Sequence, residues 1–189
     1  MTEHITATSR APAGGYGEVA VAVHDVATLR WVYPGWDAYP KYLRAWLARR
    51  APPTDEQHFH NVQLNQLHRY LVDHVDRSQP GTPERHFDEF AVGADGSATD
   101  PTDTGLGDQV YQTTVAQSID EGRDLFVSGF LDSSEANGHT LREFSIVAVD
   151  RADTANDVYA NRALFDDPVE KTNEKTVSVD ATLGWRSQE

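Results

Sequence analysis

The hydrophobic and polar positions of the C-terminal half repeat with a period of two, which predicts a domain built from β-strands. The clearest example is the segment 175–185, "KTVSVDATLGW", in which every second residue is apolar. Such alternation is typical of an antiparallel strand with one buried face. The other strand candidates are the segments 86–93, 110–119, 124–131, 140–149 and 158–165. Strands divided by turn signals at this spacing predict a domain that is mainly β, an antiparallel β-sandwich-like arrangement of about six strands over residues 86–189.

The pattern of the N-terminal part predicts a β-hairpin and two helices over residues 17–80. Valines alternate with small residues in 17–23, and 28–34 follows as a second short strand after a tight turn. Asp37 is a candidate cap for a helix that ends before Pro52. The sequence "TDEQ" from Thr54 is a capping box, so we expect a second helix with an apolar stripe from Leu64 to Val75.

The first sixteen residues are mostly polar and contain Pro12, Gly14 and Gly15. We interpret residues 1–16 as a flexible arm, or as one that a partner orders.

The charge of the chain is strongly acidic, with 30 Asp and Glu residues against 16 Lys and Arg residues and a net charge of -14. Lysine occurs only at positions 41, 171 and 175. An acidic surface that is poor in lysine stays hydrated in concentrated salt, so we expect a halophilic source. The absence of a basic run argues against nucleic-acid binding.

The chain contains no cysteine, which excludes disulfides, thiolate zinc sites and cysteine nucleophiles. No apolar run approaches the length of a membrane span, and the first residues lack the apolar core of a signal peptide. We therefore expect a soluble protein that does not bind a membrane.

The candidate chemical groups do not form a recognisable catalytic or metal-binding pattern. His58, His60, His68 and His74 lie on or near one predicted helix, at spacings that do not suit a single metal ion. Four aspartates in the loop 94–108 lack the spacing of a calcium-binding loop. This favours a solvated loop, and an adventitious Ca²⁺ or Na⁺ site is the alternative. No nucleophile elbow and no phosphate-binding loop occurs. We predict no catalytic residue, no cofactor and no metal ligand.

Aromatic residues are concentrated between positions 31 and 46. They suit a core or an interface, and a sugar site is the alternative, although no pair of acids for glycoside chemistry accompanies them. The candidate interface residues are Trp36, Tyr39, Tyr42 and Trp46.

Four segments in order resemble the signatures of a broad group of virion structural proteins from tailed phages. They are "NVQLNQL" at 61–67, "FAVGADGSATDPTDTGLGDQVYQ" at 90–112, "ANGHTLREFSIVAVD" at 136–150 and "VYANRALFDDPVEKTNEKTVSVDATLGW" at 158–185. The residues that fit the family pattern are Pro101, Asp103, Thr104, Leu106, Ala136, Asn137, Gly138, Thr140, Glu143, Arg162, Phe165, Lys171 and Lys175. Ser145 stands where the family usually has glycine, and Gln112 where a basic residue is common.

The resemblance implies a structural component of a tail tip, baseplate or fibre attachment, without catalytic residues. With the acidic composition, the virus would infect a haloarchaeon. The expected partners are further copies of the chain and other virion proteins, with a host-surface receptor as a further candidate. The expected location is the virion, assembled in the host cytoplasm in high salt. A capsid-decorating or turret protein, a receptor-binding module and a glycan hydrolase stay open as alternatives.

Glu143 raises a structural question, because it lies on a predicted strand face that is otherwise apolar. Leu141, Val147 and Val149 share that face in the strand pattern, whereas Phe144 and its alternate neighbours Arg142 and Ile146 take the other. A buried carboxylate needs a partner. We predict that Glu143 pairs with Arg162 on the next strand, or accepts hydrogen bonds from backbone amides, and so holds the register of the strands.

Overall fold

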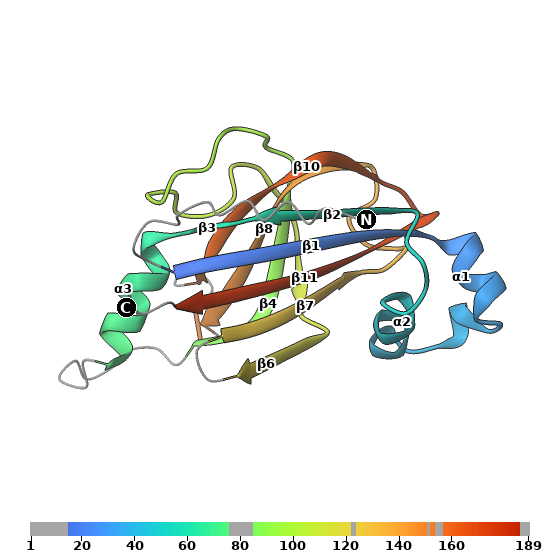
Figure 1. Ribbon diagram of the computed structural model, residues 1–189, viewed down its shortest axis with the longest axis horizontal. Coiled ribbons are helices and arrows are strands. Elements are labelled where there is room, and N and C mark those ends of the chain that lie inside the picture. Colours follow the sequence, from blue (N-terminus) through green and yellow to red (C-terminus); the bar gives the residue numbers. More distant parts are fainter. Residues whose placement is uncertain (1–14, 76–84, 122–123, 151, 154–156, 186–189) are drawn as a thin grey trace, which may run out of the picture.

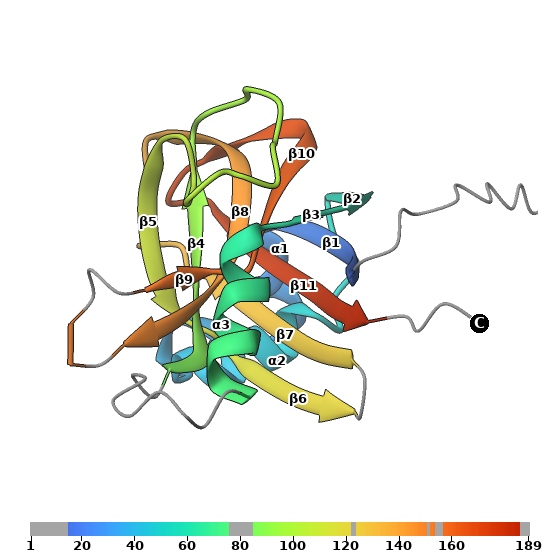
Figure 2. The same ribbon diagram turned by 90° about the vertical axis from the view of Figure 1, so that its left-hand side faces the viewer.

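Two antiparallel β-sheets pack face to face in the computed structural model, which describes residues 15–75, 85–121, 124–150, 152–153 and 157–185 (Figures 1 and 2). The first sheet has the strand order β2 (Asp55–His60), β1 (Gly15–Asp25), β11 (Lys175–Trp185), β7 (Asp124–Leu131) and β6 (Gln117–Glu121). The second has the order β3 (Val62–Gln63), β10 (Asn161–Lys171), β8 (His139–Asp150), β4 (Arg85–Gly93) and β5 (Gln109–Thr114), and β9 (Val158–Tyr159) pairs with β8. The predicted class, a mainly β sandwich-like domain, is confirmed.

The core lies between the two sheets and follows the alternation of the sequence. From β1 it takes Val19, Val21 and Val23, each at most 3% exposed. Their partners across the ladder, Ala181, Val179 and Val177 of β11, lie in the same cluster. Phe90, Phe144 and Ile146 close the core from the second sheet.

The sandwich is closed on both sides by segments that pass from one sheet to the other. On one side the chain runs from β2 into β3 through Asn61, and on the other from β5 into β6 through residues 115–116. The amide of Gln57 strengthens the first crossing, because its Nε2 donates to the carbonyl of Asp167 at 2.9 Å and its Oε1 accepts from the Asp167 amide at 3.0 Å. The strand expected over 110–119 is therefore two strands, one in each sheet.

Helices cover one end of the outer face of the first sheet (Figure 1). They are α1 (Val26–Val32), the 3₁₀ helix η1 (Trp36–Ala38) and α2 (Lys41–Ala48). Leu29, Trp36, Ala45 and Ala48 pack from them onto Phe130 of β7. We call residues 26–51 the helical cap. The last helix, α3 (Asn65–Val75), lies at the other end of the molecule, and no helix among the described residues has the length and apolarity needed to cross a membrane.

The N-terminal elements differ from the sequence prediction in three places. Residues 28–34 were expected as a strand, but Val26 and Leu29 are buried one helical turn apart and belong to α1. Helix α2 begins at Lys41, after Pro40, and Asp37 instead pairs with Arg30.

The capping box at Thr54 does not begin a helix. Its residues lead into β2, because the Thr54 amide donates to Val23 and Asp55 to His60 pair along β1. This edge pairing outweighs a four-residue local signal. The N-terminal hairpin is thus absent, and β1 lies inside the first sheet, paired with β11 over its full length.

The predicted strands of the C-terminal half are present with small changes of boundary. Residues 124–131 and 175–185 form strands with the expected bounds, whereas 158–165 is divided into β9 and the start of β10. The polar face of β11 is partly buried, since Thr176 and Ser178 lie at the end beneath the helical cap. The predicted arm, residues 1–16, lies outside the described residues except for the first two positions of β1.

Candidate functional site

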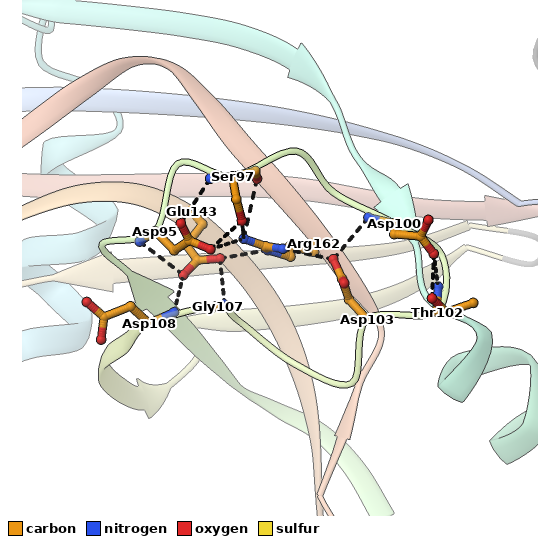
Figure 3. A network of polar contacts seen from close by, with 9 residues as sticks. All are labelled: Asp95, Ser97, Asp100, Thr102, Asp103, Gly107, Asp108, Glu143 and Arg162. Atoms are coloured by element: carbon orange, nitrogen blue, oxygen red, sulfur yellow. Dashed lines mark hydrogen bonds and ion pairs between the residues drawn. The ribbon is translucent and has the colours of Figure 1, made fainter.

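The loop 94–108 covers the outer face of the second sheet and is held there by Glu143 of β8 and Arg162 of β10 (Figure 3). Leu106 anchors the loop on an apolar floor made by Ala91, Val147 and Val149. Arg162 Nε donates to Glu143 Oε2 at 2.7 Å, which is the contact predicted from the sequence. We call the loop together with this pair the clamped loop.

Both oxygens of the Glu143 carboxylate accept hydrogen bonds from the loop, and one of them also accepts from Arg162. Its Oε1 accepts from the amides of Asp108 at 2.9 Å and Asp95 at 3.3 Å, and its Oε2 accepts from the Gly107 amide at 3.0 Å. The side chain is 0% exposed. Both predicted alternatives, pairing with arginine and capping of backbone amides, therefore occur at the same carboxylate.

The Arg162 guanidinium connects Glu143 to two aspartates of the loop. Its two terminal nitrogens donate to Asp103 Oδ2 at 2.8 Å and Asp95 Oδ2 at 2.9 Å, and it also reaches the Ser97 hydroxyl at 3.2 Å. A planar guanidinium suits several carboxylates at once. Asp95 and Asp103, which the sequence suggested to be solvated, are thus turned toward a common cation.

Short turns inside the loop are closed by their own aspartates. Asp95 accepts from the Ser97 hydroxyl and from its amide, and these bonds, followed by Arg162, lower the pKa of the Asp95 carboxyl. The amide of Asp100, and next the Arg162 side chain, lower the pKa of Asp103. Asp100 itself accepts from the Thr102 hydroxyl and amide, which lower its pKa. These aspartates therefore hold the loop best when ionised.

Two glycines allow the close approach of the loop to the sheet. A Cβ on Gly93 would lie 2.2 Å from Glu143 Oε1 and 2.6 Å from the carbonyl oxygen of Asp108. A Cβ on Gly107 would lie 2.0 Å from Asp95 Oδ2. Side chains at these two positions would displace the groups that close the clamp.

The clamp geometry does not suit catalysis. A general base must reach a substrate proton with a free lone pair, yet Glu143 is buried and already accepts from three amides and Arg162. Within the described part of the chain, no group of three or more His, Asp or Glu side chains is placed to hold a metal ion. The arrangement is a fastening for the loop.

The face assignment of β8 is correct except at two neighbouring residues, because Arg142, predicted on the Phe144 face, is exposed and lies against Gly96 of the loop, on the Glu143 side. Val147 and Val149 lie under the loop on the same side as Glu143, but Leu141 packs in the main core with Phe144. The register of β10 against β8 shifts between Leu164 and Val169, opposite the stretch between Leu141 and Glu143. A β-bulge of this kind changes which face a residue takes.

A second polar cluster joins the helical cap to the β7–β8 turn. Lys41 Nζ donates to Glu135 Oε1 at 2.7 Å, and Arg44 pairs with Asp132 at 2.5 Å. Glu135 also accepts from the Tyr111 hydroxyl at 3.1 Å. We call these residues the cap junction, because they bind the cap to both sheets.

Lys171 lies beside the cap junction and is buried, with 1% of its surface exposed. Its Nζ donates to Asn137 Oδ1 and to the Thr172 carbonyl, both at 3.0 Å. Burial lowers the pKa of Lys171 to about 8, against the opposing effect of the nearby Asp132 and Glu135 carboxylates. Asn137 and Lys171, which lie 34 residues apart in the sequence, are thus in contact.

A shallow groove of about 450 Å³ lies on the part of the first sheet's outer face that the helical cap leaves open. His58 and His60 both line it, because they lie two residues apart on β2 instead of on the expected helix. His58 Nε2 is 3.1 Å from Glu56 Oε1, and Arg49 pairs with Asp180 at the side of the cap. The side chain of His74 lies outside the described residues.

The four candidate interface residues do not share one environment. Trp36 is only 1% exposed and belongs to the core beneath the cap, so its assignment to an interface is wrong. Tyr39 is half-buried and donates from its hydroxyl to the Pro34 carbonyl at 2.9 Å. Tyr42 and Trp46 are 71% and 51% exposed, and Trp31, a further aromatic residue of the same segment, is 82% exposed.

The sequence did not identify the partners that Arg162 finds in the loop, nor the cap junction. A signal for the former existed, since an Asp-rich loop with several glycines lay between two strands of the sheet that carries Glu143. The cap junction joins residues as far apart as Lys41 and Glu135, and no local pattern links them.

Comparison of the chain with family models, with curated proteins and with solved structures found no match.

Proposed function

We propose that the protein is a structural subunit of a virion of a halophilic tailed virus, in which it assembles into an oligomeric tail, baseplate or fibre-attachment substructure. The observation that carries the proposal is the one-sided distribution of exposed apolar side chains. The large hydrophobic residues that are exposed within the described ranges are Trp31, Val32, Tyr42, Trp46, Ile119 and Phe126.

All six belong to the side of the first sheet that carries the helical cap. Four lie on α1 and α2. Phe126 lines the groove on the outer face of β7, and Ile119 is its direct partner on β6. Exposed apolar residues that gather in patches mark interaction sites of soluble proteins, and interfaces are enriched in Trp and Tyr. The distribution therefore supports the proposal that this side binds other subunits.

The other features of the molecule suit a building block. The buried Glu143 carboxylate fastens a loop and is occupied by three amides and Arg162, which weakens the glycan hydrolase alternative. The four sequence segments occur in the same order as the segments of tailed-phage virion proteins that they resemble. This resemblance is the reason for proposing a tailed virus as the assembly. The net charge of -14 suits a particle that assembles in high salt.

The test is the assembly state and the location of the protein. We expect the purified chain in molar salt to sediment as a closed oligomer, and antibodies against it to label the tail end of purified particles in electron micrographs. Labelling over the whole capsid surface would favour the capsid-decorating alternative. A monomer at all protein and salt concentrations, together with absence from purified virions, would refute the proposal.

A further inference from the structure

The two outer sides of the sandwich differ in charge as well as in apolarity, and this difference indicates how copies meet. The side of the first sheet, which we call the aromatic side, carries the six exposed apolar residues described above. The clamped loop covers the opposite sheet and has four aspartates and no lysine or arginine of its own. With Glu143 and Arg162 included, it has five carboxylates and one guanidinium, and Glu143, Asp103 and Asp95 are the carboxylates that pair with this guanidinium.

The helical cap is the least acidic part of this acidic chain. Residues 26–51 contain five of the sixteen basic residues and one of the thirty acidic ones. Most of these cations pair within the chain, in the pairs Arg30–Asp37, Lys41–Glu135, Arg44–Asp132 and Arg49–Asp180. Arg50 instead lies over the Trp46 ring, 3.6 Å from its centroid. A guanidinium stacked on an exposed tryptophan presents its edge to carboxylates of a partner.

Three pairings of two copies are available, and their electrostatics differ. Two clamped loops facing each other repel, because each carries an excess of carboxylates. Two caps facing each other place Arg50 toward a neutral to basic surface and gain no charge complementarity. A cap against a clamped loop brings an aromatic surface that carries the Arg50 guanidinium to an acidic surface, which is the complementary choice.

We propose that the aromatic side of one copy binds the clamped loop of the next copy, so that the subunits associate head to tail. Trp46 and Arg50 are the centre of the contact, and the exposed Asp100 of the neighbouring loop is the acceptor for Arg50. Apolar contact supplies affinity in concentrated salt, where screening confines ion pairing to direct contact. This inference rests on the proposed function and specifies its subunit interface.

In this arrangement, the fixed conformation of the loop favours association of the subunits. A surface loop loses conformational entropy when a partner binds it. Glu143 and Arg162 hold the acidic loop in one conformation beforehand, so less ordering remains for the association step. A heterologous contact of this kind generates a ring when its rotation closes and a filament when it does not.

Crosslinking between introduced cysteines tests the geometry, since the chain has none of its own. Ala38→Cys in the cap and Ala98→Cys in the loop are exposed positions outside the proposed central contacts. With a short bismaleimide, we expect dimers when the two single variants are mixed, and at least tenfold less from either variant alone. Crosslinking of Ala38→Cys with itself, or no crosslinking in the mixture, would overturn the head-to-tail arrangement.

Charge exchange provides a second, independent readout. We expect Arg50→Glu to weaken self-association at least tenfold, and Asp100→Lys to weaken it similarly. A mixture of the two variants has one repaired contact, in which the carboxylate introduced in the cap of one variant meets the amine introduced in the loop of the other. We expect heterodimers to form in this mixture. Equal association of all variants would contradict the proposed contact.

The two proposals fail in different ways. If wild-type protein never assembles and is absent from virions, the proposed function is wrong. If wild-type protein assembles but crosslinks cap to cap, the function stands and only the interface is wrong. Circular dichroism of each variant confirms that the fold is intact before association is measured.

Discussion

The clamped loop and the helical cap both cover an outer face of the sandwich, but different forces hold them. The loop is fixed by a buried carboxylate and guanidinium, with only Leu106 and its neighbours as an apolar anchor. The cap is fixed by an apolar cluster around Trp36, with the ion pairs of the cap junction at its edge. The loop is therefore sensitive to single charges, whereas the cap is sensitive to the removal of volume.

Replacing the carboxylate of the clamp has the largest expected effect. Glu143→Gln leaves Arg162 without its buried partner and turns an amide toward backbone donors, so we expect a loss of about 3–5 kcal/mol in the free energy of unfolding. Denaturant unfolding measures it. The adjacent Arg142→Gln is the matched control, since Arg142 is exposed, and we expect a change within about 0.5 kcal/mol. Equal effects of the two variants would show that the clamp does not stabilise the fold.

The stability of the cap depends on buried apolar volume. Two tryptophans of the cap, one buried and one exposed, test this dependence. Trp36→Ala empties the apolar cluster under the cap, and we expect a loss of about 3–5 kcal/mol in unfolding free energy. Trp31→Ala removes a side chain that is 82% exposed, so we expect a change within about 0.5 kcal/mol. Thermal unfolding followed by tryptophan fluorescence and circular dichroism compares them. A large effect of Trp31→Ala on the monomer would place Trp31 in the core.

The buried amine beside the cap junction predicts a rise of stability with pH. The pKa of Lys171 is lowered to about 8 in the folded chain and returns to its ordinary value near 10.5 on unfolding. Between these values the unfolded chain binds more protons, so stability increases as pH rises from about 8 to 10, by up to about 3 kcal/mol. Lys171→Met removes this dependence, and Lys175→Met retains it. Urea unfolding at several pH values provides the measurement, and an unchanged slope in Lys171→Met would contradict the prediction.

A methyl group at the close approach between loop and sheet has a smaller effect. The added Cβ in Gly93→Ala meets the Asp108 carbonyl and Glu143, and we expect overpacking to cost about 1–3 kcal/mol. Gly96→Ala in the same loop is the control, because its nearest contact is the flexible Arg142 side chain at 3.4 Å. We expect proteolysis of the loop to increase in Gly93→Ala only. Similar proteolysis of both variants would mean that the loop tolerates the displacement.

The sequence predicted the sandwich and the clamp pair, because both rest on patterns within single strands. The alternation in 175–185 indicated the strand, and a carboxylate among apolar residues required a partner. The helical cap was not predicted correctly, since Val26 and Leu29 also fit a short strand and the decisive contact is with Phe130, about a hundred residues away. The strand β2 that follows Thr54 was missed for the same reason, because its pairing with β1 is a long-range contact.

Lowering the pH has the smallest expected effect on stability, and it distinguishes the fastening of the loop from that of the cap most directly. The pKa values of Asp95 and Asp103 are lowered by their hydrogen bonds and by Arg162, so these carboxylates stabilise the loop above their ordinary pKa of about 3.9. Their contribution is lost as pH falls through the lower, folded-state values. We expect amide exchange in residues 94–108, corrected for the intrinsic rate, to increase below about pH 4 while exchange in the apolar cap around Trp36 stays slow. If loop and cap opened together, the polar fastening would not be the weaker of the two.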